Sequence, residues 1–198
     1  MLDTTLKGVH PSAGEPLPFA PATVVRAFTL DRPAGDLVVY AAPGLTDRGG
    51  ISAHYINHWH ETAIGSAYVD APRLIHEADA AKAEVPVART FSGRQTVGDD
   101  FELIPIPGHT PGSTAFLWNR ILFTGDQVFL DGDEWRAAVL DSSDRAAYID
   151  SLERLKTVEF DVLVPWASSL DGRWYSAADD RVARLDAIIE RLRRGEDR

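Results

Sequence analysis

The sequence predicts a layered α/β domain, in which β-sheets are covered by helices. Short runs rich in β-branched and aromatic residues, separated by Gly and Pro, fill the first two thirds of the chain, and two longer segments with helical periodicity follow. Strands that are interleaved with helices and followed by them are typical of this architecture. A chain of 198 residues is long enough for one well-packed core, and no linker or repeat divides it, so we expect a single domain over residues 1–198.

The expected strands can be placed along the chain from its turn residues. Residues 1–22 are rich in Pro and Gly, which predicts an irregular lead-in. Residues 73–83 begin with a short apolar run and continue into helix formers. The apolar and β-branched runs predict strands at residues 23–30, 36–41, 51–57, 95–107, 115–118, 120–124, 135–139 and 161–165.

Two amphipathic helices are predicted in the last third of the chain. Apolar residues recur at helical spacing over residues 143–157, with Ser142 or Ser143 as the N-cap. The same spacing appears over residues 176–194, and the segment Ser176–Asp179 resembles a capping box. These helices are the layers that we expect to cover a sheet.

The charge balance excludes some partners. Twenty Lys and Arg against 30 Asp and Glu give a formal net charge of −10, which argues against nucleic-acid binding. The basic run Arg191–Arg194 ends a predicted helix, where it complements the helix dipole. The N-terminal residues lack the pattern of a signal peptide, and no window is apolar enough to span a membrane. We therefore expect a soluble, cytoplasmic protein with no membrane partner.

Three short motifs carry residues that bind metals. The chain has no Cys, so only His, Asp and Glu side chains can serve as ligands. His58 and His60 are one residue apart at the end of a predicted strand. His109 stands in a loop of Gly and Pro, and Asp126 follows an apolar strand that ends in Gly. Each motif alone has an ordinary structural explanation, whereas the three together are specific.

In order and spacing, these motifs resemble those of the metallo-β-lactamase superfamily. The segments that carry the resemblance are Asn57–Ala63, Pro107–Thr114 and Leu122–Asp126, and the likeness extends from about Thr23 to Arg194. The resemblance implies a four-layer αββα sandwich, with a metal site at one edge of the two sheets.

The chain departs from the family pattern at three positions. The family's first motif is His-x-His-x-Asp-His, but here Thr62 stands at the Asp and Ala63 at the last His. The loop that carries the family's final histidine has Ala167 in its place. In the family these three groups bind the same one of two metals. The resemblance therefore implies that a single metal position is retained.

The resemblance assigns the retained position to His58, His60 and His109, together with Asp126, which the family shares between both metals. Donors of these types favour one zinc ion, with iron or manganese as alternatives. If Asp126 binds the ion, the site is closed and mainly structural. If it stays at a distance, a water molecule takes the fourth position and is activated, its pKa falling toward about 7. Asp126 is thus also the candidate catalytic residue.

Nearby residues have simpler interpretations. Glu61 is expected to point away from the metal and not to replace the missing Asp. His54 is expected to pack or hydrogen-bond, because the strand separates it from His58 by roughly 13 Å. Trp166 replaces a small residue of the family's loop and is expected to fill the space left by the second metal, whereas Trp174 is expected to pack in the core.

Three functions are compatible with these residues. The resemblance favours a hydrolase that uses one metal ion to cleave an ester, thioester or lactone-type bond in a small molecule. The loss of the second metal's ligands favours a catalytically silent relative that binds a small molecule or a protein. The third possible function is that of a purely structural metal that holds two loops together. The sequence does not decide among these functions and gives no oligomeric state.

Overall fold

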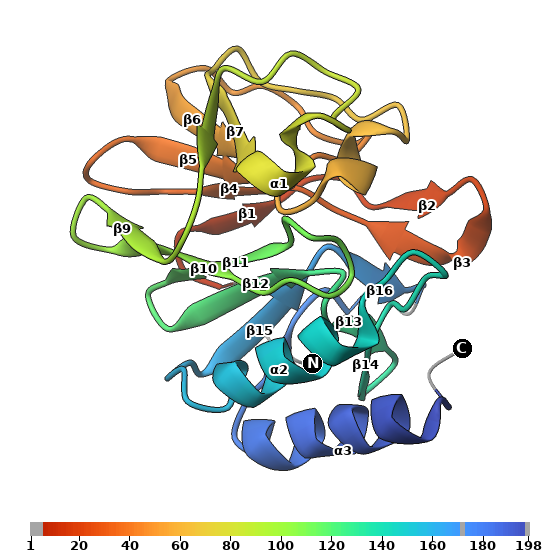
Figure 1. The fold of residues 1–198 in the computed structure, drawn as a ribbon. Coiled ribbons are helices and arrows are strands. Elements are labelled where there is room, and N and C mark those ends of the chain that lie inside the picture. The colour runs from red at the N-terminus through yellow and green to blue at the C-terminus, as the bar shows by residue number, and fades with distance from the viewer. Residues whose placement is uncertain (1–5, 171–172, 197–198) are drawn as a thin grey trace.

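The computed structural model describes residues 6–170 and 173–196, and the strands of this part of the chain form three sheets (Figure 1). The first sheet has the order β1 (Val9–Pro11), β4 (Phe28–Leu30), β5 (Asp36–Val39), β6 (Ile51–Tyr55), β7 (Arg73–His76) and β8 (Arg89–Phe91). The second has the order β17 (Ser176–Ala177), β15 (Val162–Pro165), β12 (Ile121–Gly125), β11 (Thr114–Trp118), β10 (Phe101–Pro105) and β9 (Gln95–Val97). The third has the order β14 (Glu134–Arg136), β13 (Phe129–Asp131), β16 (Ala167–Ser169), β3 (Ala20–Val25) and β2 (Glu15–Leu17).

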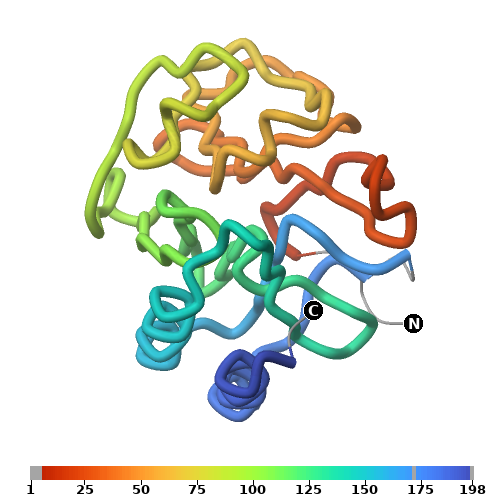
Figure 2. The backbone as a smooth tube through the Cα atoms, turned by 45° about the vertical axis from the view of Figure 1, so that its right-hand side comes forward, coloured from red at the N-terminus to blue at the C-terminus, as the bar shows by residue number. Residues whose placement is uncertain are grey.

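The third sheet combines two strands from the N-terminal part of the chain with three strands from its second half. Strand β3, near the N-terminus, pairs antiparallel with β16, and β16 pairs in parallel with β13. Figure 2 shows the result, because the red β2–β3 hairpin lies beside the blue segment that contains β16. The same view shows the orange-to-yellow half of the chain above the green-to-blue half.

The helices are short in the first half of the chain and longer in the second. The short helix η1 (Trp59–Thr62) follows β6, and α1 (Glu77–Ala80) follows β7. Helices α2 (Arg145–Leu155) and α3 (Arg181–Arg194) lie below the second sheet (Figure 1). This arrangement confirms the predicted αββα sandwich. In the part of the chain that the structure describes, no helix is both long and apolar enough to cross a bilayer.

Two hydrophobic cores follow from the alternation of side chains along β12. Phe123 points toward the first sheet and packs with Phe28, whereas its neighbour Leu122 points the other way. Leu122 belongs to the core between the second sheet and the helices, with Leu152 of α2 and Leu185 of α3. One core therefore joins sheet to sheet, and the other joins sheet to helices.

A buried tyrosine links the two main sheets near the end of β12. Tyr40 follows β5, and its hydroxyl donates a hydrogen bond to the carbonyl oxygen of Val164 at 2.9 Å. The same hydroxyl accepts the backbone N–H of Gly125 at 2.8 Å. The end of β12 is therefore held against the first sheet by a polar contact as well as by apolar packing.

The prediction of an irregular lead-in over residues 1–22 is wrong for the described residues. Strands β1 and β2 and the start of β3 all fall within it. Pro11 and Pro16 are tolerated because β1 and β2 are edge strands, where a missing backbone donor leaves no neighbour unpaired.

The predicted helix starts are also wrong. Helix α2 begins after Asp144, whose carboxylate accepts the backbone N–H three residues further on at 3.0 Å. The hydroxyl of Ser143 instead donates to the carbonyl oxygen of His109 at 3.1 Å. Ser176 belongs to β17, and α3 begins only at Arg181. A tertiary hydrogen bond therefore engages Ser143, and strand pairing with Leu163 of β15 places Ser176 outside the helix.

Replacing Leu152 by Ala tests the core between the second sheet and the helices. Leu152 is fully buried, so we expect Leu152→Ala to lower the free energy of unfolding by about 2–5 kcal/mol. Val182 of α3 is 45% exposed, and Val182→Ala should change the free energy by less than about 0.5 kcal/mol. Urea unfolding of both variants checks this, and equal losses would contradict the assignment of Leu152 to the core.

Candidate metal centre

The three histidines predicted as metal ligands lie together, although they come from different sheets. His58 and His60 follow β6 of the first sheet, at the start of η1. His109 lies in the loop between β10 and β11 of the second sheet. One ring nitrogen of each histidine lies within 4.8 Å of the other two. The packing of sheet on sheet thus brings distant segments to one point.

The contacts of the rings show which nitrogen atoms face this point. Nδ1 of His60 is 2.9 Å from Nε2 of His109. Nδ1 of His109 donates to the carbonyl oxygen of Ala138 at 2.6 Å, which leaves its Nε2 as the unprotonated atom of the neutral ring. Nδ1 of His58 donates to Oδ1 of Asn57 at 2.8 Å. Nε2 of His58 is buried and has no hydrogen-bond partner among the described residues, and a cation at this point would satisfy it.

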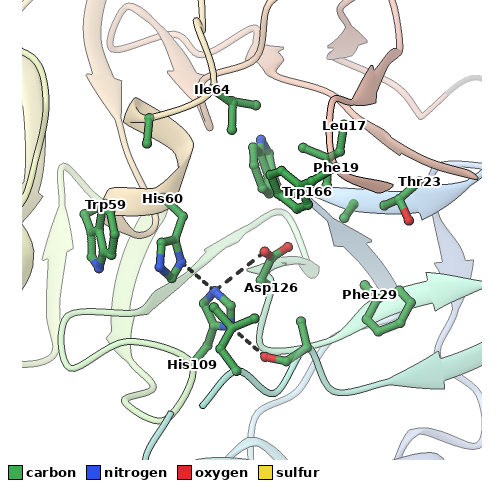
Figure 3. Close-up of a pocket in the computed structure, with 14 residues that line it drawn as sticks. Leu17, Phe19, Thr23, Trp59, His60, Ile64, His109, Asp126, Phe129 and Trp166 are labelled. Carbon is green, nitrogen blue, oxygen red and sulfur yellow. Dashed lines mark hydrogen bonds and ion pairs between the residues drawn. The ribbon is translucent and has the colours of Figure 1, made fainter. Parts of the chain in front are cut away.

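Asp126 completes the cluster at the end of β12. Its Oδ2 is 3.5 Å from Nε2 of His58 and 3.6 Å from Nε2 of His109. Its Oδ1 is buried without a hydrogen-bond partner in the described part of the chain. Figure 3 shows the Asp126 carboxylate directed toward His109. Three imidazole nitrogens and one carboxylate are a donor set that zinc accepts, so these residues fit a metal ion.

The ionisation states favour a cation at this position. Burial and the charge on His58 lower the pKa of His60 to about 3 and that of His109 to about 4, so both rings are neutral at pH 7, the form that binds metals. Burial lowers the pKa of His58 too, but the carboxylates of Asp126 and Glu61 outweigh it and raise this pKa to about 10. In the metal-free protein the His58 ring therefore carries a proton at pH 7, and a metal ion would displace it from Nε2.

Asn57 explains why a glycine precedes Asp126. The side-chain Nδ2 of Asn57 donates to the carbonyl oxygen of Thr114, which directs its Oδ1 toward His58. Gly125 has a φ of 59°, and a Cβ at this position would collide with the Asn57 amide. The Gly-Asp motif thus leaves room for the residue that orients His58.

Asp79 of α1 holds the two histidine-bearing loops together, a role that the sequence did not reveal. Its fully buried carboxylate accepts the backbone N–H of Trp59 at 3.2 Å and that of Gly112 at 2.9 Å. It also accepts the hydroxyl of Thr110 at 2.6 Å. Nothing in the local pattern marks Asp79, because all three partners are distant in the sequence.

Glu61 points away from the pocket, as the sequence analysis expects. Its carboxylate is fully buried and accepts the backbone N–H groups of Ala41 at 2.7 Å and Asn57 at 3.0 Å. It also lies 3.3 Å from Nδ1 of His58. Glu61 therefore supports a histidine of the cluster from behind, a function that the sequence analysis missed.

The positions that depart from the family pattern surround the cluster with groups that do not bind metals. The hydroxyl of Thr62 donates to the carbonyl oxygen of Trp59 at 2.6 Å. The Trp166 ring lies 5.4 Å from the His58 ring, edge-on to it, and its Nε1 donates to the carbonyl oxygen of Ala41 at 2.8 Å. Ala167 opens β16.

A pocket of about 340 Å³ borders the cluster (Figure 3). His60, His109 and Asp126 form part of its wall. Further lining residues are Leu17, Ile64, Phe129, Leu140, Trp166 and Ala167. Leu140 is 42% exposed, so the pocket reaches the protein surface. A small molecule can therefore approach the three histidines.

The remaining candidates from the sequence lie outside the pocket. His54 is fully buried, and its Nε2 is 2.8 Å from the carbonyl oxygen of Tyr40, in line with the packing or hydrogen-bonding role expected for it. Trp174 packs against Phe28 in the core between the sheets, with ring centres 5.2 Å apart.

Comparisons with known proteins agree with the αββα fold. The profile of the family described as "Metallo-beta-lactamase superfamily" matches residues 39–167. A hydroxyacylglutathione hydrolase of Anaeromyxobacter dehalogenans (strain 2CP-C) is 34% identical over 104 residues, which cover 50% of this chain and 40% of that protein. The chain therefore matches less than half the length of this curated relative.

Solved structures share the fold at low sequence identity. A metallo-beta-lactamase from Pontibacter korlensis has a TM-score of 0.70 and 13% identity, with 96% of each chain covered. The metallo-beta-lactamase FIM-1 from Pseudomonas aeruginosa, in a mono-zinc form, has a TM-score of 0.72 and 10% identity, with 97% of this chain and 94% of that one covered. ETHE1 from Myxococcus xanthus has a TM-score of 0.62 and 16% identity, with 87% and 83% covered.

Replacing Asp79 by Asn tests its role in positioning the histidines. Asn keeps one acceptor oxygen but has an NH2 group in place of the other, so at least one of the three partners loses its acceptor, and we expect Asp79→Asn to weaken zinc binding by about 10–100-fold. Competition with a chromophoric chelator measures the affinity. The exposed Asp99→Asn is the matched control and should keep the wild-type affinity. Equal affinities of the two variants would contradict this role.

His54 makes the stability depend on pH. Burial lowers its pKa to about 4 in the folded protein, against about 6.5 in the unfolded chain. The unfolded chain therefore binds the proton more readily, and the contribution of His54, complete above about pH 6.5, is lost as the pH falls toward about 4. Near pH 5 the loss is about 2 kcal/mol.

Urea unfolding of metal-free protein at about pH 7 and pH 5 measures this loss. His54→Gln should lose less stability between the two pH values than the wild type does. An identical loss in both proteins would contradict the assignment.

Proposed function

Because the chain belongs to the metallo-beta-lactamase superfamily, we propose that it is a metal-dependent hydrolase that cleaves a thioester, ester or lactone-type bond in a small molecule and uses a single metal ion. The observation that carries this proposal is the set of converging nitrogens of His58, His60 and His109, which lies with Asp126 at the wall of a pocket. The relative named as a hydroxyacylglutathione hydrolase, 34% identical over half of this chain, supports a thioester in particular.

The residues around the cluster support one ion rather than two. The positions at which the resemblance places the ligands of a second metal are Thr62, Ala63 and Ala167. Two of these residues have only a methyl group as their side chain. The Thr62 hydroxyl is already engaged with the backbone of Trp59. The mono-zinc form of the Pseudomonas aeruginosa enzyme is an instance of this fold with one ion.

We propose zinc as the ion, with iron or manganese as alternatives, because imidazole and carboxylate donors suit all three. His58, His60 and His109 would hold it, and Asp126 would stay beside the fourth position and leave it to a water molecule. When bound, the ion would act as a Lewis acid that activates a water molecule and polarises the carbonyl group of the substrate.

The protein's own groups orient the reaction. The surrounding histidines outweigh the effect of burial and keep the pKa of Asp126 below its ordinary value, so its carboxylate is ionised and can accept a hydrogen bond from a molecule in the pocket. In hydrolysis, water adds to the carbonyl carbon and the bond to sulfur or oxygen breaks. The products are a carboxylic acid and a thiol or alcohol. Asp126 is the carboxylate placed to orient the attacking water molecule.

Two alternatives are distinguished by the pocket and by turnover. A purely structural metal needs no access for a substrate, whereas His60 and His109 line a pocket that reaches the surface. A silent relative that only binds small molecules is favoured by Thr62, since a hydroxyl cannot act as a base near neutral pH. Such a protein would bind the metal but would not turn over a substrate.

Metal analysis combined with His109→Ala tests the hydrolase. Protein purified without added metal should contain about one equivalent of zinc or iron. It should hydrolyse p-nitrophenyl esters or the thioesters of N-acetylcysteamine. His109→Ala should lose the metal, and its turnover should fall by about 1,000-fold, because the charge stabilisation by the ion is worth several kcal/mol.

His10→Ala is the matched control, since His10 lies apart from the cluster against Asp31. It should keep both metal and turnover. Less than about a tenth of an equivalent of metal, even after supplementation, would contradict the proposal. Full metal content without turnover would favour the silent relative.

A further inference from the structure

We propose that the space vacated by the second metal's ligands has become the binding site for an uncharged, apolar acyl group of the substrate. This inference rests on the proposed function and goes further, because it names the chemistry of the substrate. Two of the three residues that replace those ligands do not merely fill the interior. Ala63 and Ala167 both line the pocket that contains His60, His109 and Asp126.

The pocket wall next to the cluster is apolar and rigid. Trp166 lines it and is held in two ways, by the hydrogen bond from its Nε1 to Ala41 and by edge-on packing against His58. Figure 3 shows Trp166 and Phe129 on the side of Asp126 that lies away from Trp59. A carbonyl group placed at the histidines can therefore extend its acyl chain along Trp166 and Phe129, on a surface that needs no rearrangement to receive it.

The charges of the lining residues exclude an ionic acyl group. No Lys or Arg lines the pocket among residues 6–170 and 173–196, and Asp126 is its charged carboxylate. An anionic acyl group placed against Phe129, Trp166 and Ala167 would lose hydration without a cationic partner among the lining residues. A cationic group would also lose hydration in this pocket, and the metal ion proposed beside Asp126 would repel it. An uncharged acyl chain has no ionic hydration to lose, and it gains free energy by burying apolar surface.

The size of the pocket limits the length of the chain. Its volume of about 340 Å³ is near the lower end of the range of about 300–1,000 Å³ for ligand pockets. Such a pocket suits a short to medium acyl chain rather than a long lipid.

Binding of an uncleaved probe tests this inference apart from the hydrolase activity. N-butylhexanamide has an uncharged acyl chain and resists hydrolysis, whereas the mono-N-butylamide of adipic acid carries a carboxylate at the far end of an acyl chain with the same number of carbon atoms. Calorimetric titration of the metal-loaded protein should show that the neutral amide binds more tightly, by about tenfold or more. Equal or tighter binding of the anionic probe would overturn the inference.

Variants locate the probe in the pocket. Ala63 is exposed at the pocket, so Ala63→Leu should fold normally, keep its metal and weaken binding of the amide by about tenfold. Ala167 is buried in β16, so Ala167→Leu should weaken binding of the amide from the other replaced position while lowering the free energy of unfolding by about 1–3 kcal/mol. The exposed Ala183→Leu on α3 is the matched control and should bind like the wild type. Unchanged binding in both pocket variants would overturn the inference.

The chain-length profile connects binding to turnover. With thioesters of N-acetylcysteamine, kcat/KM of the wild type should rise from acetyl to hexanoyl, and Ala63→Leu should shift the preference to the shorter chain. If the amide binds but no thioester or ester is cleaved, the ligand class stands while the hydrolase proposal fails. If thioesters are cleaved without preference for the longer chain and the amide does not bind, the hydrolase proposal stands and this inference is overturned.

Discussion

Ligands from two sheets can meet only if the ends of those sheets are held together, and the buried Tyr40 hydroxyl provides this constraint. It donates to Val164 on β15 and accepts the N–H of Gly125 at the end of β12, directly before Asp126. Apolar packing between the sheets sets their separation, but it is non-directional and does not determine how far β12 extends toward the histidines. Two hydrogen bonds through one oxygen atom set that position.

A second buried polar group, the carboxylate of Asp79, fixes the positions of the histidines in the same way. Asp79 accepts hydrogen bonds from the segment of His58 and His60 and from the loop of His109. A buried carboxylate without partners would be costly, so both loops must be in place before Asp79 is satisfied. Folding of the two loops and assembly of the cluster are therefore one event. The negative charges of Asp126 and Glu61 then make the assembled cluster a place where a cation is stable.

The sequence predicts those parts of the site that are encoded locally. His58, His60, His109 and Asp126 stand in short motifs, and the periodicity of side chains predicts the sheets and the two long helices. The roles of Asp79, Glu61 and Tyr40 cannot be predicted from local motifs, because these residues act through contacts with residues that are distant in the sequence. Ser143 shows that a local pattern can also predict a wrong role. Its position predicts an N-cap, but its hydroxyl donates to the carbonyl oxygen of His109, and local rules do not include such a distant partner.

The choice of ligand atoms has a consequence for the chemical durability of the protein. The cluster offers nitrogen and oxygen donors, and the chain contains no Cys and a single Met, at its first position. Thiolate ligands release their metal when peroxides convert them to sulfenic acids or disulfides, whereas imidazole and carboxylate groups have no such oxidation ladder. The centre can therefore keep its composition through oxidative stress that would empty a cysteine-based metal site.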